Sequence, residues 1–116
     1  MTDSTKLIDE VHEFWFGDSP YERRDVWFKK DADFDGDIRE KFSDHWEQAS
    51  ADAYDHFAET AKGRLALLIL LDQFSRNLFR GDGRAYSNDA KALALAKEGV
   101  EIGHDMAVSM IERIFL

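Results

Sequence analysis

Cysteine, proline, basic charge and long apolar runs are all scarce in this sequence of 116 residues. It has no cysteine, which excludes disulfides, thiolate nucleophiles and cysteine-ligated zinc. The longest apolar run, Leu65 to Leu71, is far shorter than the roughly 20 residues that cross a bilayer. The amino terminus, MTDSTKLIDE, lacks the basic and apolar regions of a secretory signal. We therefore expect a cytoplasmic protein without a membrane span.

Basic residues are outnumbered, with 15 Lys and Arg against 24 Asp and Glu and a net charge of −9. Such a charge argues against non-specific binding to nucleic acid or to an anionic membrane, so any anion site must be local. We expect no metal site, because the four histidines lie on separate segments without a ligand spacing, and no cofactor, because no phosphate-binding glycine loop stands out. These histidines are His12, His45, His56 and His104.

The apolar residues recur at spacings of three and four, and the only proline falls near the start of the chain. This pattern, with few runs of Val, Ile or Thr, predicts one all-α domain over residues 1–116. Expected helix caps are Asp3 or Ser4, Ser19 before Pro20, Asp35, Thr60, and Ser87 or Asn88, and expected helix ends are Gly17, Gly81 to Gly83 and Gly103.

The central helix, expected from Ala61 to about Arg80, begins apolar and then becomes polar in the segment LLILLDQFSRNLFRGDG, residues 67–83. Because its apolar residues cover more than one face, we expect other helices to surround it and its polar groups to be paired. Two pairs have the spacing of four that lets side chains meet on a helix: Asp72 with Arg76, and Gln73 with Asn77.

Three arginines lie toward the end of this helix, at Arg76, Arg80 and, beyond the turn, Arg84. Two interpretations are open. The arginines form an internal clamp, with Asp89 as a partner for Arg76 or Arg80, or they form a site for a carboxylate or phosphate, which planar guanidinium groups suit. The candidate site residues are Asp72, Gln73, Arg76, Asn77, Arg80, Arg84 and Asp89.

The last segment, HDMAVSMIERIFL, builds an apolar face and carries no capping residue or glycine after Leu116. We expect a domain that lacks C-terminal helices, or a helix that needs a partner, for example in a homodimer through this segment.

Several stretches together resemble one bacterial family, the domain of unknown function 924: FWFG at 14–17, WF at 27–28, LALLILLDQFSRNLFRG, NDAKAL after it, and ERIFL at 112–116. The resemblance implies an all-helical fold of the tetratricopeptide-like superfamily, with five to six helices as antiparallel hairpins stacked in a right-handed superhelix, and no established activity. Family members continue into a His-Ser-Glu segment, for which this sequence has no matching positions.

Two classes of function follow from these patterns. The first is a binding or scaffold module that accepts a protein or peptide partner, as tetratricopeptide-like folds often do. The second is an enzyme that acts on a small anionic substrate held by Arg76 and Arg80, with Asp72, or the histidine of the family's further C-terminal segment, as an acid or base. A clamp should be sealed inside the protein, whereas a site should lie at a pocket that water reaches.

Overall fold

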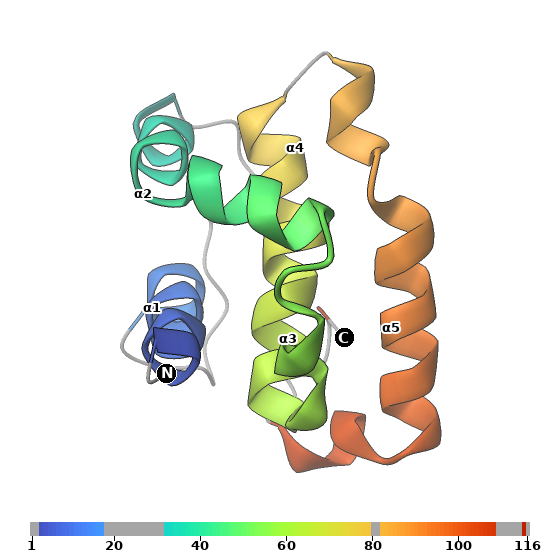
Figure 1. Cartoon of the computed structure of the whole chain (residues 1–116). Helices are drawn as coiled ribbons and strands as arrows, with labels where there is room; N and C mark the ends of the chain where they lie inside the picture. The colour runs from blue at the N-terminus through green and yellow to red at the C-terminus, as the bar shows by residue number, and fades with distance from the viewer. Residues whose placement is uncertain (1–2, 18–31, 80–81, 109–114, 116) are drawn as a thin grey trace.

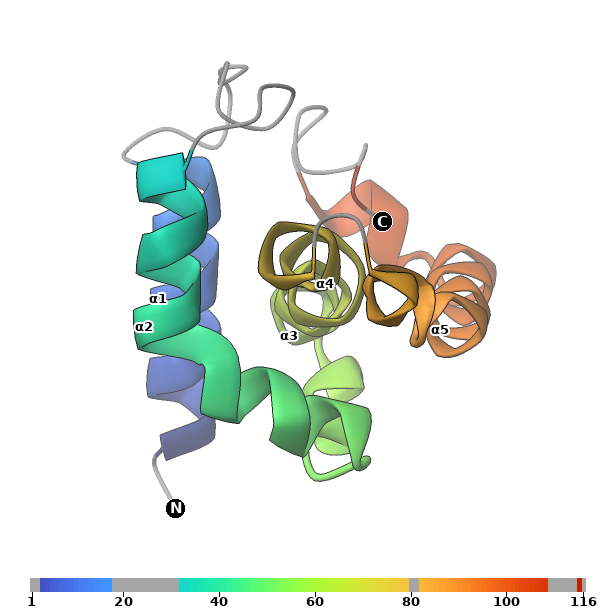
Figure 2. The same cartoon turned by 90° about the horizontal axis from the view of Figure 1, so that it is seen from above.

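The computed structural model describes residues 3–17, 32–79, 82–108 and 115 of the chain, and every regular element in these ranges is helical. The all-α prediction is therefore confirmed. Helices α1 and α2 lie side by side as an antiparallel pair, α3 and α4 continue one another through the middle, and α5 runs antiparallel to them on the far side (Figure 1, Figure 2). Stacking of such pairs into a right-handed superhelix stays a prediction.

The α1/α2 pair supplies one wall of the core. Helix α1 spans Asp3–Phe16 and ends, as predicted, at Gly17, which has a left-handed φ of +70°. Helix α2 spans Ala32–Ser50, so it starts before the cap expected at Asp35. That prediction was wrong because Asp35 is only 7% exposed and accepts a hydrogen bond from Asn77 instead. The helix expected from Pro20 to Phe28 lies outside the described residues.

The central helix begins as predicted but is not one regular helix. A short 3-10 turn, Asp55–Glu59, precedes α3, Ala61–Leu68, and the Thr60 hydroxyl accepts a hydrogen bond from the Gly63 amide at 3.0 Å. A π-helical turn, η3, then spans Ile69–Gln73, and α4 spans Phe74–Leu78. All residues from Gly63 to Leu71 are buried, which confirms that this helix lies at the centre.

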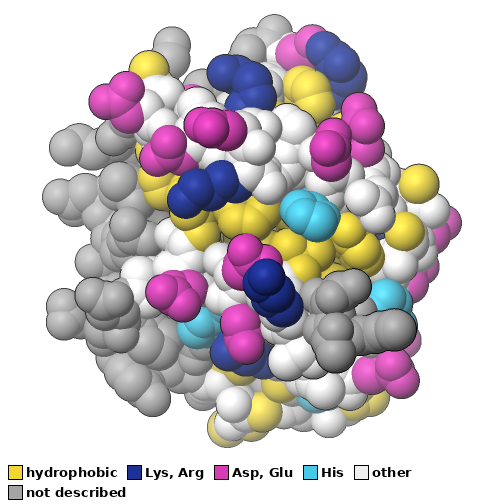
Figure 3. Space-filling model, turned by 60° about the vertical axis from the view of Figure 1, so that its left-hand side comes forward, with side chains coloured by type: hydrophobic (Ala, Val, Ile, Leu, Met, Phe, Trp, Pro, Cys, Tyr) yellow, Lys and Arg dark blue, Asp and Glu magenta, His cyan; other side chains and the backbone are white. Residues whose placement is uncertain are grey.

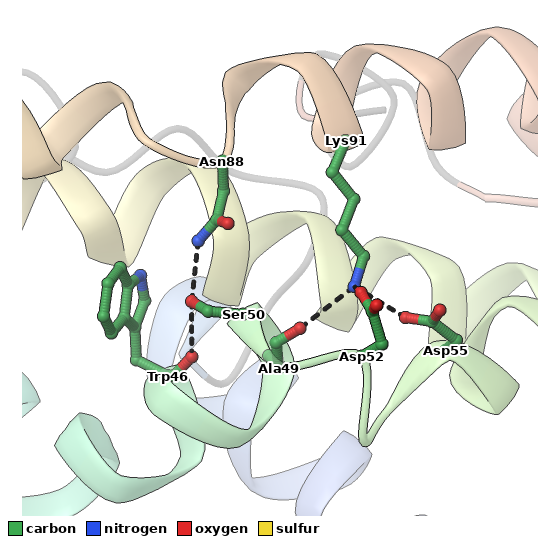
Figure 4. Close-up of polar contacts among 7 residues, drawn as sticks. All are labelled: Trp46, Ala49, Ser50, Asp52, Asp55, Asn88 and Lys91. Carbon is green, nitrogen blue, oxygen red and sulfur yellow. Dashed lines mark hydrogen bonds and ion pairs between the residues drawn. The ribbon is translucent and has the colours of Figure 1, made fainter.

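Helix α5 closes the fold on the other side. A 3-10 turn, η4, spans Gly83–Tyr86, and α5 spans Asp89–Glu101. Asn88 stands before α5 as expected, yet its side-chain oxygen accepts no capping hydrogen bond, and its Nδ2 donates to Ser50 Oγ at 2.8 Å (Figure 4). Gly103, with φ of +86°, precedes the 3-10 turn η5, His104–Ala107. Most of the expected final apolar segment, residues 109–114 and 116, lies outside the described residues.

Aromatic rings join the α1/α2 pair to the central helix. Phe74 of α4 lies with its ring centroid 5.0 Å from Phe42 of α2, and 6.0 Å and 5.8 Å from Phe14 and Trp15 of α1. Phe14 also stacks on Phe34 at 5.0 Å. Three elements that are distant in sequence therefore share one aromatic core.

Candidate functional site

The π-helical turn η3 carries two of the predicted site residues, Asp72 and Gln73. A π turn holds one residue more than a normal helical turn, and such turns occur often at functional sites. Here the turn faces α5 across a pocket of about 350 Å³. The described residues that line this acidic pocket are Leu68, Asp72, Gln73, Asp89, Ala92, Leu93, Ala96 and Phe115.

Both oxygens of the Asp72 carboxylate accept hydrogen bonds on the η3 side of the acidic pocket. Its Oδ1 accepts from Arg76 Nη2 at 3.1 Å, the predicted pair four residues apart, and its Oδ2 accepts from Gln73 Nε2 at 2.8 Å. The Asp72 and Arg76 side chains are 30% and 50% exposed, so this ion pair lies at the rim of the pocket and not in a sealed core.

The carboxylate of Asp89, the first residue of α5, differs from that of Asp72 in its hydrogen bonding. Its Oδ1 is buried and has no hydrogen-bond partner in the described part of the chain. The expected pair of Asp89 with Arg76 is not formed, since Arg76 turns to Asp72 and to the ring of Tyr86, 5.6 Å away. A buried acceptor without a partner is unusual in folded proteins, and it marks this pocket.

Asn77 does not belong to the acidic pocket. Its Nδ2 donates to Asp35 Oδ1 at 2.6 Å, and both side chains are buried between α4 and α2. The expected contact between Gln73 and Asn77 is therefore not made, because the two amides serve different sides of the helix. Asn77 and Asp35 therefore form a buried internal pair, whereas Asp72, Gln73 and Asp89 line a pocket.

Arg84, another of the predicted arginines, has different partners from Arg76. Arg84 of η4 pairs with Asp82 at 3.1 Å, and its guanidinium lies over the Phe79 ring at 4.5 Å from the centroid. The Arg84 amide and side chain both donate to Asp82, and these hydrogen bonds lower the pKa of that exposed carboxyl. Arg80 lies outside the described residues, so the convergence of all three arginines stays a prediction.

Sequence reasoning missed Arg64, the most buried charged side chain among the described residues, at 2% exposure. Its Nε donates to His104 Nδ1 at 2.9 Å and its Nη1 to the Leu95 carbonyl at 2.8 Å. Its Nη2 donates to the Ala58 carbonyl at 3.0 Å and to Glu98 Oε1 at 2.8 Å. The available signal was Gly99, a glycine inside a helical pattern, which leaves room for this side chain.

A further hollow, of about 310 Å³, lies between α1 and α2, where apolar side chains gather among acidic and basic ones (Figure 3). Its polar lining residues, Glu10, Glu13 and Lys41, are all exposed, so it holds no buried polar group that needs a partner. None of the described helices is long and apolar enough to cross a membrane, and no described cluster of three His, Asp or Glu side chains is placed to hold a metal ion.

The family model described as bacterial protein of unknown function (DUF924) matches residues 11–116. The chain belongs to this family. A solved structure, that of the protein of unknown function ATU0120 from Agrobacterium tumefaciens, is 40% identical and superposes with a TM-score of 0.89. The match covers 97% of this chain and 62% of that one, so this family member spans less than two thirds of its structural relative. No curated protein matches the chain.

Proposed function

We propose that this protein is a binding module, and that the acidic pocket between η3 and α5 holds an ammonium group of its ligand. The carrying observation is the buried Asp89 Oδ1 without a partner among the described residues. An ammonium group offers three donors and a compensating charge, which an ionised carboxylate in a pocket requires. Such a group is present on small amines and on the lysine side chain or amino terminus of a peptide.

The charge of the acidic pocket supports a cation. Asp72 is already compensated by Arg76, and the Gln73 amide is used by Asp72, which leaves Asp89 as the uncompensated charge. Removing a carboxylate from water without a counter-charge costs free energy, and a bound cation supplies the missing counter-charge. The net charge of −9 also raises the local concentration of cations around the whole protein.

The remaining wall of the acidic pocket suits an aliphatic group. Leu68, Ala92, Leu93, Ala96 and Phe115 line it, so a ligand with a hydrocarbon chain behind its ammonium group buries apolar surface there. An enzyme acting on an anion held by Arg76 and Arg80 has less support, because Arg76 is engaged by Asp72 and Tyr86. A cytoplasmic location and a protein or peptide partner belong to the same proposal.

Titration with n-hexylamine, followed by amide chemical shifts in NMR spectra, tests this proposal. We expect saturable shifts around the acidic pocket with a Kd of about 1 mM, and weaker binding by about tenfold in Asp89→Asn, which keeps the shape and removes the charge. The matched control is Asp44→Asn, an exposed aspartate on α2, which should bind like the wild type. Equal binding of n-hexanol, unchanged affinity in Asp89→Asn, or no saturable shift would each overturn the proposal.

A further inference from the structure

A separate pocket of about 250 Å³ lies on the other side of the central helix, between α2 and residues at the end of α4 and in η4. It concentrates basic and aromatic groups in a chain of strongly negative charge. Its described lining residues are Arg39, Ser43, Trp46, Glu47, Leu78, Phe79 and Arg84, and we call it the arginine pocket. Two arginines from distant parts of the sequence line it.

Both arginines keep donors for a ligand. Arg39 is exposed on α2 and makes no hydrogen bond or ion pair with any side chain in the described ranges. Arg84 uses one of its terminal nitrogens for Asp82 and rests on the Phe79 ring, which holds its planar group in place at the pocket. A guanidinium has five donors, so Arg84 retains most of them beside Arg39.

The aromatic wall of the arginine pocket is fixed by the core. Trp46 lies edge to face with Phe79, with ring centroids 4.7 Å apart, and its Nε1 donates to the buried Ser75 Oγ at 2.6 Å. The indole nitrogen is therefore used internally, and the ring offers only apolar surface to a ligand. The rest of the recognition falls to the arginines and the Ser43 hydroxyl.

We infer that the arginine pocket binds an aromatic carboxylate. Arg84 is paired with Asp82, and with Glu47 included these groups carry no net formal charge, so the positive charge open to a ligand is that of Arg39 and suits one singly charged carboxylate better than a doubly charged phosphate. A carboxylate accepts paired hydrogen bonds from a guanidinium, and its ring packs against Trp46 and Phe79. The ring adds the apolar burial that an exposed ion pair alone does not provide.

Calorimetric titration with benzoate, and with its neutral analogue benzamide, measures this preference. We expect benzoate to bind with a Kd of about 1 mM and benzamide to bind about tenfold more weakly or not at all. Arg39→Gln and Arg84→Gln should each weaken benzoate binding by about tenfold, because each removes one guanidinium. Both side chains are exposed, so the helical circular dichroism of the variants should match that of the wild type.

The control is Lys97→Gln, which removes one positive charge from the exposed side of α5 and should leave the benzoate affinity unchanged. Equal affinity for benzoate and benzamide would show that the pocket recognises only the ring. An Arg39→Gln variant that binds as tightly as the wild type, or absence of saturable benzoate binding by the folded protein, would overturn the inference as well.

Discussion

Arg64 shows how one side chain determines what its neighbours can be. Four hydrogen bonds hold its guanidinium between the 3-10 turn Asp55–Glu59, α5 and η5, and Glu98 is the only carboxylate among the acceptors. Buried charges persist only when their donors are matched in this way. The aliphatic part of the side chain passes directly beside Gly99, where a Cβ would lie 2.6 Å from Arg64 Cδ. Gly99 is therefore required by packing and not by backbone conformation.

We predict opposite effects for two Gly→Ala substitutions inside helices. Gly36→Ala in α2, where no atom lies within 4 Å of the added Cβ, should stabilise the protein by about 0.5 to 1 kcal/mol, because alanine favours the helix. Gly99→Ala should destabilise it by about 1 to 3 kcal/mol, because the methyl group displaces the held Arg64 side chain.

Urea denaturation of both variants measures these free energies, and each variant is the control for the other. Stabilisation by Gly99→Ala would show that Arg64 moves aside at little cost and that its hydrogen bonds contribute little.

At the scale of elements, Lys91 fastens α5 to the end of α2. Its ammonium group donates to the Ala49 carbonyl at 3.0 Å, and it pairs with Asp52 and with Asp55, the latter at 2.7 Å (Figure 4). Partial burial lowers the pKa of Lys91, but the hydrogen bonds to the two carboxylates outweigh that effect, so the pKa lies above its ordinary value of 10.5. The tether is thus formed by a charged lysine.

We predict that Lys91→Met destabilises the protein by about 0.5 to 1.5 kcal/mol at neutral pH, because it removes the hydrogen bonds to the Ala49 carbonyl and to two carboxylates, which are exposed and stay solvated. A raised pKa in the folded state gives stability that is present below the unfolded pKa and lost as the pH rises through the folded pKa. The difference between wild type and Lys91→Met should therefore be constant up to about pH 10 and shrink above it.

Chemical denaturation across this pH range provides the measurement, with Lys97→Met on the exposed side of α5 as the control, expected within about 0.5 kcal/mol of the wild type. A difference that stays constant well above pH 11 would contradict the assigned role of the ammonium group.

Elements whose signals are local could be predicted from the sequence. Several of these features depend on residues within one or two helical turns. They are the Thr60 cap, the helix ends at Gly17 and Gly103, the burial of the central helix and the pair of Asp72 with Arg76. Three of the candidate site residues, Asp72, Gln73 and Asp89, line the acidic pocket, but their role as a site stays a prediction.

Features that depend on distant partners could not be predicted. Spacing does not reveal that Asn77 would bond to Asp35, that Arg64 would reach α5, or that Arg39 and Arg84 would line one pocket. The sequence also predicts one regular helix where the structure has the π turn η3. These distant contacts decide which polar residues form the buried Asn77–Asp35 pair and which line the acidic pocket or the arginine pocket.

At the scale of the whole molecule, the aromatic core makes the α1/α2 pair and the central helix depend on one another. Phe74 is fully buried and contacts rings from both α1 and α2, so no part of this core is complete without the others. We therefore expect unfolding in a single transition. Phe74→Ala should cost about 3 to 5 kcal/mol, which is a large share of the about 5 to 15 kcal/mol that a domain has.

Urea denaturation followed both by helical circular dichroism and by tryptophan fluorescence tests this dependence. Of the three tryptophans, Trp15 of α1 lies 5.8 Å from Phe74 and Trp46 lies on α2, so fluorescence reports largely on the α1/α2 pair while circular dichroism reports all helices. Both midpoints should fall together in Phe74→Ala, and Val100→Ala, at a side chain 55% exposed on α5, should shift neither by more than about 0.5 kcal/mol. If the fluorescence midpoint fell while the circular dichroism midpoint stayed, α5 and the central helix would be stable without the α1/α2 pair. The acidic pocket would then belong to an independently stable half of the molecule, because all of its described lining residues lie outside α1 and α2.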